Sequence, residues 1–171
     1  MNRRLGIWLF WSLTAIGCAT TGTLQNGVYR GEQASYRIGP VSSDWTRVTV
    51  DHQNDLAWHD AAKEAVMHVD SDCDPGLDIP LVALRNHLII GFTERKVIEE
   101  EVVPMDGREA LRTHLRAKLD GVPREILLQI LKKDGCVYDF GLITAPGPTF
   151  DEALVDFDRM LDGFTTRTAE P

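Results

Sequence analysis

Apolar and polar residues alternate from residue 111 to residue 119 (LRTHLRAKL), which is the period of a strand with one buried face. Asp-Gly pairs flank this stretch and recur with regular spacing, at 106–107, 120–121 and 134–135. Asp-Gly is typical of a two-residue type I′ turn, in which both residues need positive φ. The pattern therefore predicts an antiparallel meander over residues 94–105, 108–119, 122–133 and 136–145.

The predicted turns also determine which residues face each other across the meander. Leu115 comes opposite Ile126, and on the other face a row of positive or potentially positive side chains comes opposite carboxylates. The row consists of Arg112, His114, Arg116 and Lys118, with Glu101 opposite Arg112, Glu99 opposite His114 and Glu125 opposite Arg116. This agreement favours strands, although Leu111, Leu115 and Leu119 also fit helical spacing. We expect the basic row to lie on a solvated face.

Two stretches have helical periodicity, one between the short strands and the meander and one after the meander. DIPLVALRNHLIIG (78–91) has Asp78 as its expected N-cap, and TFDEALVDFDRMLDGF (149–164) has Thr149 and Glu152 as an expected capping box. The last two meander strands are apolar on both faces, which predicts cover on both sides of part of the sheet. Short strands are expected earlier in the chain, over 28–38, 46–50, 55–60 and 64–70. This order predicts an α+β fold with helices packed on an antiparallel sheet.

The N-terminus has the layout of a secretory signal. Two arginines precede an apolar run over residues 5–16, which is too short to span a bilayer. The run ends in LTAIGC, which resembles the lipobox of bacterial lipoproteins because a small residue directly precedes Cys18. The resemblance implies cleavage before Cys18 and attachment to a membrane through lipid on its thiol. The alternatives are a plain signal peptide and an uncleaved anchor.

This interpretation divides the chain into four parts. They are a signal peptide (1–17), a lipidated tether (18–27), one domain (28–165) and a C-terminal tail (166–171). Ala19 follows the cysteine where an Asp is the usual inner-membrane retention signal in enteric bacteria, so the periplasmic face of the outer membrane is favoured.

The net charge and the cysteine count bear on the class of partner and on a disulfide. The formal net charge of −8 argues against a nucleic-acid partner. Besides Cys18 the chain has only Cys73 and Cys136, an even pair in an oxidising compartment. We expect them to form a disulfide, and two separate buried thiols are the alternative.

The sequence offers few candidates for chemistry. DSDCDPG (70–76) begins like a calcium-binding loop, but Pro75 stands where such a loop needs glycine, so an acidic connecting loop is favoured. The histidines lack metal-ligand spacing, and no nucleophile or phosphate-loop motif occurs, so no catalytic residue, metal or cofactor is predicted. The best candidate for binding an anion or a partner is the basic row, Arg112, His114, Arg116 and Lys118. The alternative is that these residues only form exposed salt bridges on the surface of the sheet.

Two segments resemble PsbP-like proteins, a family named for an extrinsic subunit of the photosynthetic oxygen-evolving complex. YRIGPVSSDW (36–45) is similar to the start of that domain, and CVYDFGLITAPGPTFDEALVDFDRMLDGF (136–164) is similar to its closing strand, loop and helix. The resemblance implies an α/β/α sandwich and a role in binding or assembly, and it brings no catalytic residues.

We therefore expect a non-enzymatic, lipid-anchored binding or assembly module of the bacterial cell envelope, with an envelope protein as partner. The alternative is a carrier or sensor of a small hydrophobic or anionic ligand, such as an accessory lipoprotein of lipid transport. A hydrolase is a more distant alternative.

Overall fold

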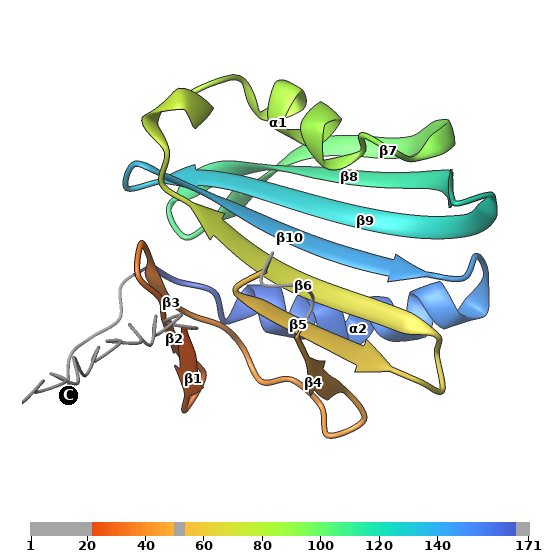
Figure 1. The fold of residues 1–171 in the computed structure, drawn as a ribbon, viewed down its shortest axis with the longest axis horizontal. Helices are drawn as coiled ribbons and strands as arrows, with labels where there is room; N and C mark the ends of the chain where they lie inside the picture. The colour runs from red at the N-terminus through yellow and green to blue at the C-terminus, as the bar shows by residue number, and fades with distance from the viewer. Residues whose placement is uncertain (1–21, 50–53, 167–171) are drawn as a thin grey trace, which may run out of the picture.

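The computed structural model describes residues 22–49 and 54–166, and its main feature is one long antiparallel sheet (Figure 1). The order of its seven strands is β4-β5-β6-β10-β9-β8-β7. Their bounds are β4 Thr46–Val48, β5 Leu56–Asp60, β6 Ala65–Asp72, β7 Thr93–Met105, β8 Arg108–Leu119, β9 Val122–Lys133 and β10 Cys136–Thr144. A smaller sheet of three strands contains β1 Thr23–Gln25, β2 Val28–Arg30 and β3 Ser35–Arg37.

The predicted meander is confirmed in its strands, turns and register. All three Asp-Gly turns have positive φ at both residues, for example 46° at Asp106 and 75° at Gly107. Leu115 lies opposite Ile126, as predicted. The charged register is also as predicted, with Arg112 opposite Glu101, His114 opposite Glu99 and Arg116 opposite Glu125. The pattern of local turns and alternating residues was therefore sufficient to place every strand of the meander.

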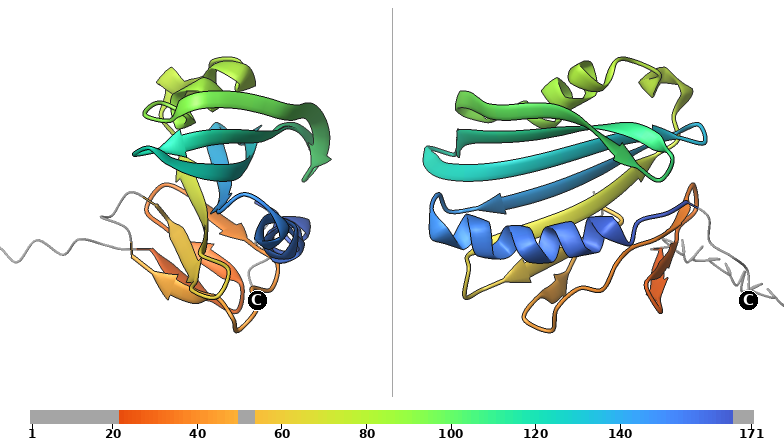
Figure 2. Two further views of the ribbon diagram at one scale, coloured as in Figure 1. Left: turned by 90° about the vertical axis from the view of Figure 1, so that its right-hand side faces the viewer. Right: turned by 180° about the vertical axis from the view of Figure 1, so that it is seen from behind.

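Helices cover both faces of the sheet, which confirms the α+β class and the three-layer arrangement. The helices are α1 Leu81–Leu88 and α2 Pro148–Asp162, and a short 3-10 turn, η1 Pro75–Leu77, precedes α1. Alternate residues of β9 point to opposite faces. Leu127 belongs to the core under α2 with Phe157, while Leu128 belongs to a separate cluster with Ile89 just after α1. Figures 1 and 2 show the two helices on opposite sides of the sheet.

Both predicted helix caps are wrong. The residue before α1 is Pro80, and Asp78 instead accepts a hydrogen bond from the Lys132 ammonium. The residue before α2 is Gly147, and the Thr149 hydroxyl donates back to the carbonyl of Ala145. In both helices a proline at or beside the first turn sets φ and removes one orphan N–H, which reduces the need for a side-chain cap.

The folded domain begins earlier than predicted, in the segment expected to be a tether. β1 pairs with β2 through a turn at Asn26 and Gly27, whose φ values of 51° and 74° are those of a type I′ turn. The predicted tether over 18–27 is therefore shortened by this hairpin. At the other end, Thr166 donates to Asp106 and Asp134, so the first residue of the predicted tail is held by two hairpin turns.

Within residues 22–49 and 54–166, no helix is long and apolar enough to cross a membrane. Cys18 and the predicted signal peptide lie outside the described residues.

Candidate functional site

Arg112 and His114 of the basic row lie beside α2, which corrects the prediction of a solvated face for these two residues, whereas the Arg116 side chain is 56% exposed. The Arg112 guanidinium donates to Asp158 of α2 at 2.7 Å and to the amide oxygen of Gln129 at 2.9 Å. Its side chain is only 20% exposed. Glu101 is the neighbour of Arg112 in the strand register but is not its ion-pair partner.

His114 is held between a ring and a carboxylate. Its imidazole stacks on Phe150 of α2, with ring centroids 4.6 Å apart and planes 5° from parallel. Its Nε2 lies 2.9 Å from Oε1 of Glu125, which also accepts hydrogen bonds from Arg116 and from the Gly147 backbone N–H. Burial tends to raise the pKa of Glu125, but these hydrogen bonds outweigh it and hold the pKa below its usual range.

The remaining members of the row are also paired. Arg116 lies 3.1 Å from Glu125, the partner that the sequence predicted, and Lys118 lies 2.7 Å from Glu94. The row as a whole is therefore matched by carboxylates of β7, β9 and α2. Arg112 and His114 fasten α2 to the sheet, and an anion would have to compete with the carboxylates along the row.

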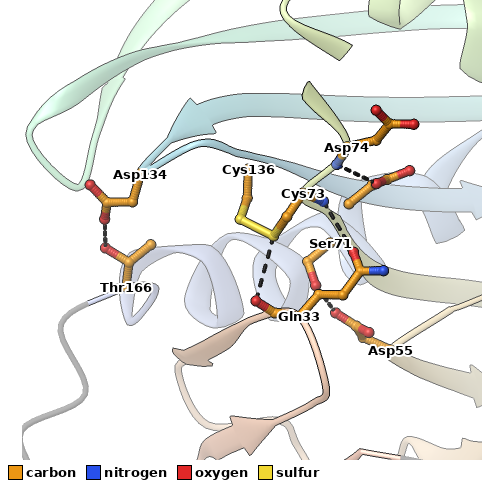
Figure 3. The surroundings of a disulfide bond; sticks show 9 residues. Gln33, Asp55, Ser71, Cys73, Asp74, Asp134, Cys136 and Thr166 are labelled. Carbon is orange, nitrogen blue, oxygen red and sulfur yellow. Dashed lines mark hydrogen bonds between the residues drawn. A yellow bond between two sulfur atoms is a disulfide. The ribbon is translucent and has the colours of Figure 1, made fainter. Parts of the chain in front are cut away.

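Cys73 and Cys136 form the predicted disulfide, which joins the end of β6 to the start of β10 (Figure 3). Gln33, in the loop between β2 and β3, lies against it. The Gln33 side-chain oxygen accepts from the Cys73 backbone N–H at 3.2 Å, and its carbonyl oxygen lies 3.6 Å from the Cys73 sulfur. The disulfide thus links two neighbouring strands of the large sheet, and the two Gln33 contacts hold the loop of the small sheet against it.

A hollow of about 520 Å³ lies beside this disulfide. It is lined from η1, the end of β9 and the start of β10, and Arg108 reaches it from β8. Its apolar lining is Pro75, Leu77 and Val137, with Cys136 of the disulfide, and its charged lining is Asp74, Asp78, Arg108, Lys132 and Lys133. The mixture of apolar wall and a few charged groups is typical of small-molecule sites.

A second hollow, of about 490 Å³, lies between β7 and α2 and includes Arg112. Its carboxylates outnumber its cations: they are Glu101, Asp106, Asp158 and Asp162. Since Arg112 is already paired with Asp158, this hollow has an acidic character and is a poor site for an anion.

Two carboxyl groups that the sequence did not single out as a pair face each other across β6 and β10. Asp70 lies opposite Asp139 in the strand register. Burial, together with the charge of Asp55, raises the pKa of Asp70 to about 6. Burial, together with the charge of Asp70, raises the pKa of Asp139 to about 7. The Asp139 Oδ1 atom is buried and has no hydrogen-bond partner among the described residues.

Asp55 also organises a network that the sequence did not indicate. It accepts hydrogen bonds from the hydroxyls of Tyr29, Tyr36 and Ser71 (Figure 3 shows the Ser71 contact). Burial and the hydrogen bond to Asp55 raise the pKa of Tyr29, and burial and the charge of Asp55 raise that of Tyr36. The network fastens the small sheet to β6.

The acidic loop at 70–76 serves local structure. The Asp72 side chain accepts from the Asp74 backbone N–H, and Asp74 caps η1 by accepting from the Gly76 N–H. In the part of the chain that the structure describes, no group of three His, Cys, Asp or Glu side chains is arranged to hold a metal ion.

The longest exposed element is β7, at one edge of the large sheet. Among the described strands it pairs only with β8. Its side chains are exposed from Thr93 to Val102, and exposed apolar groups occur at Val97, Ile98 and Val102. Its register with β8 shifts between Thr93 and Lys96 and again between Val97 and Glu99.

Comparison with known proteins supports the fold. No protein-family model matches the chain, and a search of curated proteins gives no match. The structure is similar to cyanobacterial PsbP (CyanoP) from Synechocystis, with a TM-score of 0.54 and 19% identity over 91% of this chain and 98% of that chain. It is also similar to LpqN, described as involved in cell envelope biogenesis of Mycobacterium tuberculosis, with a TM-score of 0.53 and 15% identity over 79% of this chain and 86% of that chain. At these identities the likeness establishes a PsbP-like fold.

Proposed function

We propose that this protein is a lipid-anchored, non-enzymatic binding or assembly module on the periplasmic face of the bacterial cell envelope. Three observations support the proposal. The segment LTAIGC resembles a lipobox, the domain has a PsbP-like fold, and one protein with a similar structure, LpqN, is described as involved in cell envelope biogenesis.

The observation that carries the proposal is the open edge of β7. A strand at the edge of a sheet presents backbone N–H and C=O groups that a strand of a partner protein can pair with. β7 spans 13 residues and has exposed valine and isoleucine side chains along it. After the second register shift, β7 pairs regularly with β8, so the outer edge of its segment from Glu99 to Val103, which ends before Pro104, can accept an extended segment.

The side chains of β7 indicate the chemistry of that partner. Glu99 and Glu101 are exposed, and both belong to the face of the sheet that carries the basic row. They have no ion-pair partner among the described residues, whereas Glu100 on the other face pairs with Arg85. A partner strand with lysine or arginine at alternate positions would complement the two free carboxylates.

Site-specific photocrosslinking in intact cells tests the β7 interface. A photoreactive amino acid replaces Val102 of β7, and the matched control replaces Val155 of α2, because the two valines are 60% and 59% exposed. The proposal predicts a discrete envelope-protein adduct from position 102 and none from position 155, and Glu101→Lys should weaken that adduct. Equal adducts from both positions, or none from position 102, would contradict a binding edge at β7.

A separate experiment tests the membrane anchor. Growth with a palmitate analogue should label the wild-type chain, and Cys18→Ala should abolish the label and leave the precursor uncleaved. Separation of inner and outer membranes on a density gradient should place the labelled protein with the outer membrane. Equal labelling of wild type and Cys18→Ala would contradict the lipoprotein interpretation.

A second candidate function is that of a carrier or sensor of a small amphipathic ligand. The hollow beside the disulfide favours this candidate, because its volume of about 520 Å³ is in the range of small-molecule sites. The interior under α2 is less suitable, since Tyr138, Phe140 and Leu142 of β10 are buried there and pack in the main core.

A further inference from the structure

We propose that the hollow beside the Cys73–Cys136 disulfide binds a small amphipathic carboxylate, with the carboxylate at Arg108 and Lys132 and the apolar body against Leu77 and Val137. The inference rests on the second candidate function, that of a ligand carrier or sensor, and names the chemical class of its ligand.

The cations of this hollow differ in how firmly they are already engaged. Arg108 has no hydrogen bond or ion pair among the described residues, so its guanidinium is free to take a ligand. Lys133, by contrast, donates at 2.6 Å to both the backbone oxygen and the carboxylate of Asp106, and this pair is nearly buried. The charge of Lys133 is therefore balanced by Asp106, and Lys133 offers no free donor to a ligand.

Lys132 is intermediate, because its partner is at the surface. It pairs with Asp78, whose side chain is 85% exposed, and it also donates at 3.1 Å to the backbone oxygen of Ile79. Exposed pairs of this kind contribute little to stability, because water screens both charges. A ligand carboxylate can therefore replace Asp78 at Lys132 at little cost, while Asp78 turns into solvent.

The carboxylates of the hollow do not block this arrangement. Asp74 points its Oδ1 to the Gly76 backbone N–H at 2.7 Å and is committed to capping η1. With Lys133 paired to Asp106 and Asp78 displaced, Arg108 and Lys132 face the single carboxylate of Asp74. This local excess of positive charge contrasts with the net charge of −8 of the chain and with the acidic hollow that contains Arg112.

The apolar wall of the hollow is the reason why we expect the ligand to have an apolar part besides its carboxylate. Val137 is buried in one cluster with Ile130 and Leu84, and Leu77 packs against that cluster at the edge of the hollow. Each methylene group of an aliphatic chain that packs on this wall leaves water, which favours binding. A guanidinium binds a carboxylate through two parallel hydrogen bonds, which gives Arg108 a larger role than a point charge would have.

Calorimetric titration of the full chain in nonionic detergent, with micelles alone as the blank, tests the proposal. The probes are hexanoate, hexanol and inorganic phosphate, which present the whole ligand, the apolar part alone and an anion alone. The variants are Arg108→Ala, Arg108→Lys and the matched control Arg30→Ala, since Arg30 is exposed on β2 and does not line the hollow.

The proposal predicts saturable binding of hexanoate that is at least tenfold weaker in Arg108→Ala, reduced in Arg108→Lys and within twofold of wild type in Arg30→Ala. Hexanol and phosphate should each bind at least tenfold more weakly than hexanoate. Circular dichroism checks that each variant is folded. If Arg108→Ala does not fold, Arg108→Lys still tests the proposal.

Absence of hexanoate binding, binding unaffected by both Arg108 variants, or equal binding of hexanol or phosphate would overturn the proposal. These outcomes leave the membrane anchor and the β7 interface standing, because those depend on labelling and crosslinking. Conversely, loss of the β7 adduct or of lipidation does not alter the expected hexanoate titration.

Discussion

Asp139 of β10 lies directly opposite Asp70 of β6, so two carboxyl groups share one part of a sheet face. The pair has little solvation, and Oδ1 of Asp139 is buried without a hydrogen-bond partner among the described residues. Burial, together with the charge of Asp70, raises the pKa of Asp139 to about 7, and burial, together with the charge of Asp55, raises that of Asp70 to about 6. The folded protein therefore holds protons that the unfolded chain, with Asp near 3.9, releases.

The pair predicts that the protein loses stability as pH rises through 7. A carboxyl with a raised pKa contributes stability that is fully present below its unfolded value and is lost as pH rises through its folded value. His68 acts in the opposite sense, because burial lowers its pKa to about 4, so its contribution is lost as pH falls from its unfolded value near 6.5. Among the described groups with a shifted pKa, the carboxyl pair changes its protonation most between pH 6.5 and pH 8. Urea unfolding should therefore show a lower free energy at pH 8 than at pH 6.5.

Asp139→Asn isolates the contribution of the pair. The amide cannot ionise, so the variant should be more stable than wild type at pH 8, by about 1–3 kcal/mol, and the difference should shrink at pH 5. The matched control is Asp151→Asn, on the exposed side of the first turn of α2. Parallel pH profiles for wild type and Asp139→Asn would contradict a raised pKa at this position.

Local and distant pairings differ in how far the sequence predicts them. The meander could be predicted because each strand is joined to the next by a two-residue turn, such as that at Asp106, and the turn fixes the register. The pairing of β6 with β10 has no such turn, since a helix and three strands lie between them. The opposition of Asp70 and Asp139 therefore could not be predicted from spacing.

The surroundings of the basic row show the same limit. The sequence predicts correctly that Arg112 and His114 share one face of β8, but not that α2 lies over that face. The position of α2 depends on tertiary packing, for example the stacking of Phe150 on His114. Long-range docking of α2 therefore places Arg112 and His114, which were predicted to be solvated, in a helix interface.

Substitution of Thr113 tests which face of β8 is buried. Thr113 has no exposed surface, and its hydroxyl donates to Glu100 at 3.0 Å. Thr113→Lys should therefore destabilise the protein by at least about 3 kcal/mol in urea unfolding, because a long charged side chain has no room beside Leu115. Thr113→Ser keeps the hydroxyl and should cost about 1 kcal/mol. A benign Thr113→Lys would contradict the packing of this face.

Removal of the disulfide should have a large effect on stability. Cys73 and Cys136 are separated by 63 positions, so the bond closes a long loop in the unfolded chain. The chain-entropy model gives a stabilisation of about 4 kcal/mol for such a loop. The double variant Cys73→Ala, Cys136→Ala should lose that amount in urea unfolding without reductant. With reductant present, wild type should fall close to the variant, and equal stability of the two proteins without reductant would contradict the bond.

Gly39 allows the chain to cross closely over the end of α2. Its backbone N–H donates to the carbonyl of Met160 at 2.8 Å. A Cβ at this position would lie 2.0 Å from the backbone oxygen of Arg159. This oxygen belongs to the main chain of α2, so a side-chain rotation cannot remove the clash. Gly39→Ala therefore has to displace the C-terminal end of α2 together with Phe164, whose ring contacts those of the main core.

We expect Gly39→Ala to lower the free energy of unfolding by at least about 2 kcal/mol, because overpacking against a backbone cannot be relieved by a side-chain rotation. Gly76→Ala is the matched control, since the atoms nearest to its added Cβ belong to the side chain of Asp74, at 3.2 Å, and this exposed side chain can move. Urea unfolding of both variants measures the difference. If Gly39→Ala were as stable as Gly76→Ala, the close crossing of this segment over α2 would be wrong, and the docking of the C-terminal segment on the main core would need another explanation.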